Sequence, residues 1–342
     1  MSNKLFRTIW LALMGLAFLV SCSQENQNQP VALHGQTMGT TFNVKYYPGE
    51  HTPDQEQVLA AINKRLVEIN QLMSTYIPDS ELSLLNQTKA GEAFSLSPEN
   101  VYLINEALRV NELSEGYYDI TVGPLVNLWG FGPTGRVTKQ PDADVLQQSR
   151  EWVGANKLSV TNNKIVKPHD KTYIDLSSLA KGYGVDEVAN VLELFSVENY
   201  LVEIGGELRV NGIKPDNKKW VVAIEKPPTS LQREIQLYVK PDNMGIATSG
   251  DYRLYFEENG VRYSHLIDPL TGKPIQHNLA TVTVFHPSSA VADALSTAIN
   301  VMGPEKGLAI AEKHNIAIYM LVRSGDGFEE IASSKFESYL NL

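Results

Sequence analysis

The stretch TVTVFHPSSAVADALSTAINVMG, which runs from Thr281 to Gly303, sets the fold that we expect for this chain. Its beginning is rich in β-branched side chains and predicts a strand over Thr281–Phe285. Its second half places Ala, Leu, Ile and Met at helical spacing, which predicts a helix over Ala292–Gly303. A helix over Gly307–His314 and a strand over Ile316–Val322 are expected to follow. Helices and strands are therefore expected to share one core.

Farther from this stretch, helices dominate the first half of the chain and strands the second. Helices are predicted over Asp54–Met73, from Ser97-Pro98 to a stop at Gly116, over 141–153 and over Leu179–Leu194. Strands are predicted over Phe42–Tyr47, Tyr200–Ile204, Trp220–Ile224, Ile235–Val239, Arg253–Phe256 and Val261–Ile267, with a hairpin over Lys157–Val166. This order predicts an α+β protein with two subdomains packed into one unit.

The helix of the opening stretch carries two polar side chains on one face. Asp293 and Thr297 are four residues apart, so they lie about one helical turn from each other. One interpretation is local, because Asp in a first turn favours the positive end of the helix dipole and Thr can bond back to a carbonyl. The other is that two hard oxygen ligands point at a hard cation such as Mg²⁺. Taken alone, the local interpretation is favoured.

Composition excludes one broad class of function. The chain has 342 residues, of which 43% are hydrophobic and 20% charged, and its formal net charge is -10. These values are typical of a folded body with one large or two small domains. Because nucleic-acid binders are more often basic, and no basic patch with interleaved aromatic residues is present, no nucleic-acid partner is expected.

The N-terminus has the pattern of an export signal. Lys4 and Arg7 precede the apolar run Ile9–Val20, and the only cysteine of the chain, Cys22, follows at the expected cleavage point. The arrangement resembles a bacterial lipoprotein signal in which Cys22 is lipidated; the alternative is a plain signal peptide with a chance cysteine. We expect residues 1–21 to be the signal peptide, 22–35 a polar tether and 36–342 the folded domain.

Polar residues gather among glycines in five further stretches, which are Thr37–Thr41, Gly116–Gly132, Ile174–Asp186, Ala247–Arg253 and Ser264–Gly272. Turn and capping chemistry accounts for any one of them, since Gly, Asp, Ser and Thr make turns. Turn and capping chemistry accounts less well for all five stretches together with the polar face of the Asp293 helix. The match of Gly130–Gly135 to a dinucleotide-binding pattern is rejected, because Pro133 lies inside it and no clear strand-to-helix unit surrounds it.

In order, and over nearly the whole mature chain, these stretches resemble the ApbE family, the FAD:protein FMN transferases. The resemblance rests on MGT at 38–40, DITVGPLVNLWGFG at 119–132, DLSSLAKGY at 175–183, LVEIGGE at 201–207, ATSGDY at 247–252, SHLIDPLTG at 264–272 and ADALSTA at 292–298. It implies mixed and antiparallel sheets with packed helices, and an active site between two subdomains.

The resemblance also implies a reaction and a ligand set. FAD is cleaved with Mg²⁺, FMN is attached through a phosphoester to a Thr or Ser of an acceptor protein, and AMP leaves. The metal would be held by Asp293, Thr297 and the backbone carbonyl of Ser178. The flavin nucleotide would be contacted by Met38, Tyr76, Tyr117, Tyr118, Asp119, Asp175, Lys181 and Ile267.

The acceptor hydroxyl needs a base to take its proton, and His265 is the candidate because it is the sole histidine within a family motif. The alternative for His265 is a structural, hydrogen-bonded role beside the Asp268-Pro269 turn. Asp251 is a second candidate for orienting groups. Glu207 stands where the family commonly has Asp, a change that we expect to lie far from the metal ligands.

Competing functions remain at this point. An FAD pyrophosphatase that releases FMN and AMP would use the same metal site, whereas a non-catalytic FAD-binding lipoprotein would not need one, and a purely structural lipoprotein would bind no FAD. The resemblance implies acceptors among flavin-carrying subunits of membrane redox complexes, such as sodium-translocating NADH:quinone reductases. The expected location is the periplasmic face of the inner membrane, with the outer membrane as the alternative.

Overall fold

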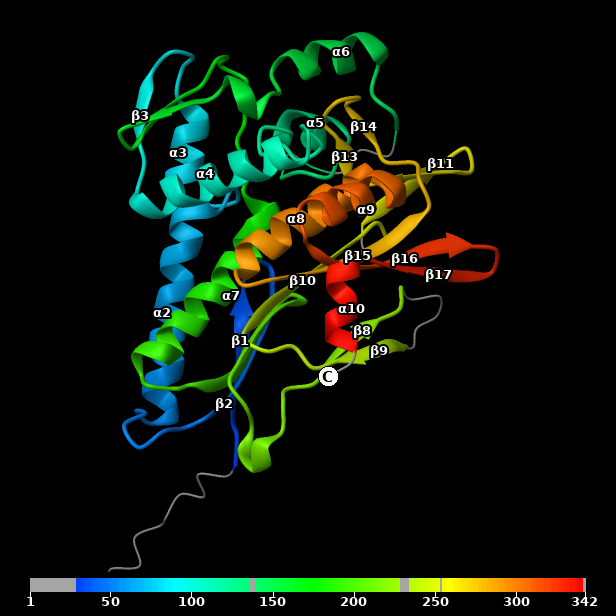
Figure 1. The fold of residues 1–342 in the computed structure, drawn as a ribbon. Coiled ribbons are helices and arrows are strands. Elements are labelled where there is room, and N and C mark those ends of the chain that lie inside the picture. Colours follow the sequence, from blue (N-terminus) through cyan, green and yellow to red (C-terminus); the bar gives the residue numbers. More distant parts are fainter. Residues whose placement is uncertain (1–28, 134, 136–138, 228–233, 253, 341–342) are drawn as a thin grey trace, which may run out of the picture.

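In the computed structural model, described residues are 29–133, 135, 139–227, 234–252 and 254–340. The predicted signal peptide and Cys22 lie outside them. An eight-stranded sheet forms the centre, with each strand antiparallel to its neighbours (Figure 1). Its strands, in spatial order, are β1 (Val31–Thr37), β2 (Thr40–Tyr47), β6 (Asn199–Ile204), β7 (Glu207–Asn211), β10 (Met244–Gly250), β15 (Leu279–His286), β16 (Ala317–Ser324) and β17 (Gly327–Ala332).

Helices cover one face of this sheet and enclose the largest core, as Figure 1 shows for the green α7 and orange α8. The helices are α2 (Gln55–Met73), α3 (Glu81–Gln87), α4 (Pro98–Leu113), α7 (Ser177–Leu194), α8 (Ser289–Met302) and α9 (Pro304–Lys313). Helix α8 lies against both β10 and β15 and packs along α7. The core contains Val282 and Val284 of β15 together with Leu295 of α8.

The opposite face of the sheet is covered by a small hairpin and the last helix. These elements are β8 (Val222–Glu225), β9 (Ile235–Val239) and α10 (Ser334–Leu340). Phe285 of β15 and Tyr319 of β16 contribute to a second core there, and both rings lie near Phe336 of α10. Because side chains alternate along a strand, Val284 and Phe285 enter different cores, and β15 is apolar on both faces.

A third group of elements packs beside the C-terminal end of α8, where Val301 packs in a small cluster with Leu266 and Ile275. It comprises α5 (Gly123–Leu128), α6 (Ala143–Glu151), β11 (Tyr255–Glu258), β12 (Val261–Ser264), β13 (Ile267–Asp268) and β14 (Lys273–Pro274), which we call the α5–β14 unit. Its core holds Leu125, Trp129 and Tyr263, and the last two rings stack with centroids 5.5 Å apart. A small sheet of β3 (Ala93–Ser95), β5 (Lys164–Val166) and β4 (Ser159–Thr161) lies elsewhere, with short 3₁₀ turns at Ala155–Lys157 and Pro215–Asn217.

The α+β class is confirmed, and the long predicted helices are present. Strands β1, β3, β7, β10, β14 and β17 and helices α3, α5 and α10 were not predicted. The predicted tether boundary at residue 35 is wrong, because β1 begins at Val31, which pairs with Tyr46 of β2. Leu33 of this strand is buried, and Gly35 leaves room for the ring of Phe42. The strand is therefore part of the core.

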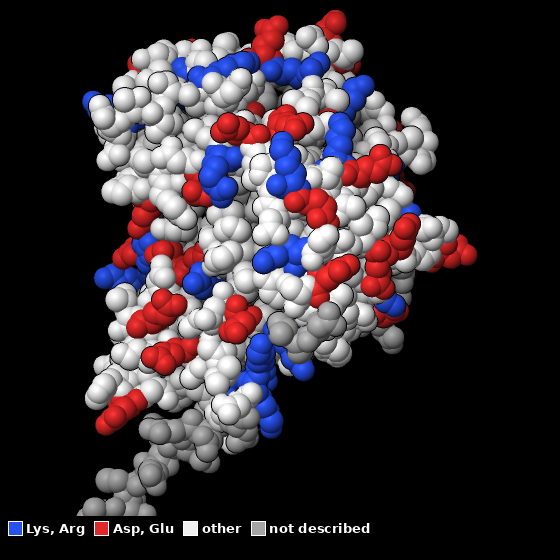
Figure 2. Space-filling model, viewed as in Figure 1, with Lys and Arg blue, Asp and Glu red and all other residues white. Residues whose placement is uncertain are grey.

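Figure 2 shows basic and acidic side chains interspersed on the visible face, with neither sign forming a continuous stripe there. Among the described residues, no helix combines the length and the apolar character needed to cross a membrane.

Candidate active site

Helix α8 carries the Asp293–Thr297 face and is buried along nearly its whole length. The side chain of Ser288 caps it by accepting a hydrogen bond from the N–H of Val291 at 3.3 Å. Helical residues start at Ser289, so Asp293 lies beyond the first turn, where the dipole of the helix no longer favours a carboxylate. The local interpretation of Asp293 as a first-turn residue is therefore wrong.

Two glycines allow α8 to lie close to its neighbours. A Cβ on Gly182 of α7 would lie 2.1 Å from the carbonyl oxygen of Ser289. A Cβ on Gly245 of β10 would lie 2.6 Å from the backbone nitrogen of the same serine. Any larger residue would push α8 outward, so these glycines fix how near α8 lies to α7 and to the sheet.

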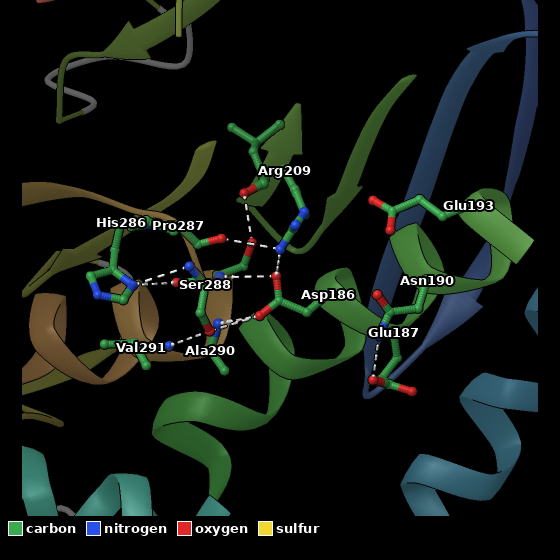
Figure 3. A network of polar contacts seen from close by, with 12 residues as sticks. Asp186, Glu187, Asn190, Glu193, Arg209, His286, Pro287, Ser288, Ala290 and Val291 are labelled. Carbon is green, nitrogen blue, oxygen red and sulfur yellow. Dashed lines mark hydrogen bonds and ion pairs between the residues drawn. The ribbon is translucent and has the colours of Figure 1, made fainter. Parts of the chain in front are cut away.

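A carboxylate of α7 binds the start of α8 (Figure 3). Asp186 accepts hydrogen bonds from the N–H groups of Ser289 and Ala290 at 3.0 and 3.1 Å and from the hydroxyl of Ser288 at 2.9 Å. Arg209 of β7 pairs with the same carboxylate at 2.8 Å. An anion that binds the free N–H groups of a helix start is stabilised by the helix dipole. The contact ties the two helices together one turn before Asp293.

Three charged side chains meet where α7, α8 and β7 converge. The ammonium of Lys181 lies 2.6 Å from Glu207 Oε1 and 3.6 Å from Asp293 Oδ1. The backbone N–H of Gly182 donates to Asp293 Oδ2 at 3.1 Å. We call Lys181, Glu207 and Asp293 the charged triad; the two carboxylates are almost fully buried, whereas Lys181 is partly exposed.

Burial raises the pKa of the Asp293 carboxyl group, and the nearby Lys181 acts in the opposite direction. The charge of Glu207 also raises it. A divalent cation bound to Asp293 would reverse this shift, because it stabilises the carboxylate. Asp293 is thus a buried acid that is poised to be ionised by a cation.

The donor set around Asp293 suits a hard cation. Thr297 lies one turn along α8 and lines the same cavity. Ser178 lines the cavity as well, one helical turn before Gly182, whose N–H donates to Asp293. A carboxylate, a hydroxyl and a carbonyl match Mg²⁺, which keeps several waters or substrate oxygens. No cluster of three or more His, Cys, Asp or Glu suited to a metal occurs among the described residues.

Aromatic residues form another wall. The hydroxyl of Tyr118 lies 2.9 Å from Ser178 Oγ, and burial raises the pKa of Tyr118 far above its ordinary range, so it stays neutral. The hydroxyl of Tyr117 bonds to the ammonium of Lys306 from α9. Tyr76 is 71% exposed and lies at the rim. Flat apolar faces with polar edges are suited to an aromatic ring system.

His265 lies between β12 and β13 and lines the same cavity. Its Nδ1 is 3.0 Å from the carbonyl oxygen of Leu254. A carbonyl only accepts, so Nδ1 carries the proton and Nε2 is the basic nitrogen of the neutral ring. The ring of Phe131 meets the imidazole edge-on, with centroids 6.5 Å apart. These contacts hold the imidazole in one orientation.

All of these groups face one cavity of about 380 Å³ between α8 and the α5–β14 unit. Of the predicted site residues that the structure describes, all except Met38 and Asp251 line it, namely Tyr76, Tyr117, Tyr118, Asp119, Asp175, Ser178, Lys181, His265, Ile267, Asp293 and Thr297. Residues from widely separated parts of the chain are thus brought together around one space.

The model of the ApbE family matches residues 38–320. The chain belongs to the ApbE family. It is 46% identical over 333 residues to an FAD:protein FMN transferase of Vibrio cholerae, covering 97% of this chain and 99% of that protein. The same name is given to a Haemophilus influenzae relative that is 46% identical over 341 residues, with 98% of each chain covered.

Solved structures agree with this assignment. The flavin transferase ApbE from Vibrio cholerae superposes with a TM-score of 0.85 at 45% identity, covering 91% of this chain and 99% of that one. The apo flavinyl transferase ApbE of Pseudomonas stutzeri also gives a TM-score of 0.85, at 40% identity, covering 92% and 98% of the two chains. The predicted ApbE-like fold is thereby confirmed.

Three predicted residues of this ApbE-family chain have structural contacts of their own. Asp119 accepts hydrogen bonds from the N–H and hydroxyl of Thr121, at 2.7 and 2.6 Å, and from the N–H of Ala155 at 2.8 Å. Asp175 accepts the N–H of Ser177 at 2.8 Å, just before the start of α7. Met38 is not among the described residues that line the cavity; its side chain packs near Gly184.

Two expectations about carboxylates are corrected. Asp251 is not among the described residues around the cavity, because its carboxylate forms a two-point ion pair with Arg323 at 2.9 and 2.5 Å. Glu207, expected far from the metal ligands, instead lines the cavity and pairs with Lys181. The Gly205-Gly206 pair, in which both residues have positive φ, signals the tight turn that starts β7 with Glu207, but sequence cannot say which helix lies over it.

Proposed function

We propose that this chain transfers FMN from FAD to a Thr or Ser hydroxyl of an acceptor protein and releases AMP. The observation that carries the proposal is the charged triad, with Thr297 and the Ser178 carbonyl, at one side of a cavity that also has tyrosine walls. The names of the relatives support the same reaction.

In this reaction the acceptor oxygen forms a bond to the phosphorus nearer the flavin, and the bond from that phosphorus to the bridging oxygen breaks. The bridging oxygen and its electron pair leave with AMP. Lys181 places an ammonium where it offsets the diphosphate charge. Asp293, Thr297 and the Ser178 carbonyl would hold Mg²⁺, which when bound supplies further positive charge to the diphosphate.

The flavin ring is proposed to lie against the aromatic and apolar wall. Tyr118 and Ile267 are buried there, and Tyr117 is fixed by Lys306. The rim residue Tyr76 is proposed to cover the ring from the solvent side. This arrangement leaves the charged triad for the diphosphate.

His265 is proposed as the base that takes the acceptor hydroxyl proton on Nε2. Its fixed Nδ1–H and its place on the cavity wall support this role. We expect His265→Ala to lower kcat by about 10²–10⁴-fold and to remove the lower limb of the pH–rate profile. A matched control is His169→Ala. His169 stacks on Trp152, and neither residue is among the described residues that line the cavity. An unchanged pH profile in His265→Ala would leave His265 with the structural role only.

The location and the acceptor also remain proposals. The charged start, apolar run and Cys22 support a lipid anchor that holds the domain at the periplasmic face of the inner membrane, with the outer membrane as the alternative. Acceptors are proposed among exported flavin-carrying subunits of membrane redox complexes.

The deciding experiment mixes the full chain in detergent with FAD, Mg²⁺ and an exported acceptor domain. A fluorescent acceptor band on a denaturing gel together with free AMP, both removed by a chelator and by Asp293→Asn, is expected. The exposed Asp170→Asn is the matched control, because Asp170 is not among the described residues around the cavity. AMP without a band, with several acceptors tried, would indicate a pyrophosphatase. Bound FAD without either product would indicate a binding protein.

A further inference from the structure

Glu207 is a buried carboxylate at the edge of the cavity. It follows the Gly205-Gly206 turn as the first residue of β7 and pairs with Ile204 of β6. It is 2% exposed, yet it is one of the residues that line the cavity. Strand pairing therefore holds its backbone, while its side chain reaches the space where α7 and α8 meet.

The two oxygens of Glu207 have different surroundings. Oε1 accepts from the Lys181 ammonium at 2.6 Å. Oε2 is buried and, among the described residues, has no hydrogen-bond partner. A buried carboxylate oxygen without a donor is costly, so this atom is suited to a donor that enters the cavity.

The position of Lys181 depends on this carboxylate. Its ammonium lies 2.6 Å from Glu207 but 3.6 Å from Asp293, so the shorter contact is with Glu207. Lys181 thus pairs with both carboxylates, and a closer approach to Asp293 would compete more strongly with any cation for the Asp293 oxygens. With both carboxylates ionised, the triad has two negative charges and one positive, and a bound cation would offset the remaining negative charge.

We propose that Glu207 is a positioning residue that holds the Lys181 ammonium closer to itself than to Asp293 and so keeps Asp293 available to a divalent cation. Its second oxygen accepts a hydrogen bond from a donor that enters with the cation, such as one of its water molecules. The inference rests on the proposed function for the identity of the cation, Mg²⁺.

The test titrates Mg²⁺ alone into the full chain, without FAD or acceptor, and follows the melting temperature. Wild type is expected to gain stability as Mg²⁺ binds. Glu207→Gln keeps the size of the side chain but frees Lys181 to move closer to Asp293, so the midpoint should move to about tenfold higher Mg²⁺ or more. Glu207→Asp keeps the charge and should give a midpoint between the two.

The matched control is Glu187→Gln. Glu187 lies on α7 and forms an equally short ion pair, 2.6 Å from Arg65, but it is not among the described residues around the cavity. Its loss should lower the melting temperature without moving the Mg²⁺ midpoint. An equal midpoint shift in Glu187→Gln would make the effect one of general stability and overturn the inference.

A double substitution separates positioning from a merely structural role. If Glu207 acts through Lys181, adding Glu207→Gln to Lys181→Met should move the Mg²⁺ midpoint much less than it does in wild type. Equal shifts in both backgrounds, or a wild-type midpoint in Glu207→Gln, would overturn the inference. If Glu207→Gln fails to fold, Glu207→Asp and Lys181→Met take its place. Mg²⁺ midpoints equal to that of wild type in both of these variants would overturn the inference.

The outcome is independent of the proposed transfer. A wild-type chain that responds to Mg²⁺ but transfers no FMN would overturn the proposed function and leave this inference standing. A wild-type chain whose melting temperature does not respond to Mg²⁺ would overturn the inference, whatever its transfer activity.

Discussion

The substitution Gly182→Ala would force α7 and α8 apart at the point where they meet. The new Cβ would lie 2.1 Å from the carbonyl oxygen of Ser289 and 2.7 Å from the backbone nitrogen of Ala290. Both contacts are with backbone atoms near the start of α8, so rotation of a side chain cannot relieve them. A Cβ essentially never approaches closer than 3.0 Å, so the helices would have to separate by roughly 1 Å.

The magnitude follows from two opposing effects. Alanine in place of glycine inside a helix stabilises it by about 1 kcal/mol. Overpacking against a core that cannot relax costs about 1–3 kcal/mol, and more where backbone must move. Because both contacts are with backbone atoms, the upper part of this range, about 2–3 kcal/mol, applies, and we expect the free energy of unfolding to fall by about 1–2 kcal/mol. The 3.1 Å contact from Gly182 to Asp293 would also break, and a displacement of about 1 Å at a reacting site costs about 100-fold in rate.

Urea unfolding and the rate of FMN transfer measure the two effects. Gly184→Ala is the matched control on the same helix, because its Cβ would meet the flexible end of Met38 at 3.0 Å and Ile204 Cδ1 at 3.2 Å rather than backbone. It should change stability and rate only slightly. Wild-type stability and rate in Gly182→Ala, or equal losses in Gly184→Ala, would refute the reasoning.

Two further predictions concern the start of α8. Asp186→Asn removes the charge that binds this helix end and Arg209, so the free energy of unfolding in urea should fall by about 1–3 kcal/mol. Asp326→Asn, in the exposed turn between β16 and β17, should change it little, and equal effects would contradict the capping role. Burial lowers the pKa of His286, whose Nδ1 accepts the N–H of Ser288 at 3.1 Å. Below pH ~6.5 the unfolded chain therefore binds the His286 proton more readily than the folded chain, and the free energy of unfolding should fall as the pH is lowered from 7.5 to 5. This fall should be less steep in His286→Gln, and an equally steep fall in that variant would contradict the prediction.

Local pattern was sufficient for the long helices. In α2, Val58, Ile62 and Leu66 recur at helical spacing and are all buried, as the period predicts. Strand β10 was not predicted, because its sequence MGIATSG has glycines and hydroxyls that are also typical of turns. Its pairing with β7 and β15 makes it a central strand, and pairing of segments distant in the sequence leaves no local signal.

In the candidate site, too, some features follow from the local sequence and others from the tertiary structure. The sequence by itself determined that Asp293 and Thr297 share a face, because the helical repeat fixes the direction of side chains four residues apart. It also identified, through family resemblance, eleven of the residues that line the cavity. Only the tertiary structure decided that Lys181 lies between Glu207 and Asp293. That arrangement depends on how closely α8 packs against α7 and β10, and backbone contacts at Gly182 and Gly245 set this distance rather than any local preference of the chain.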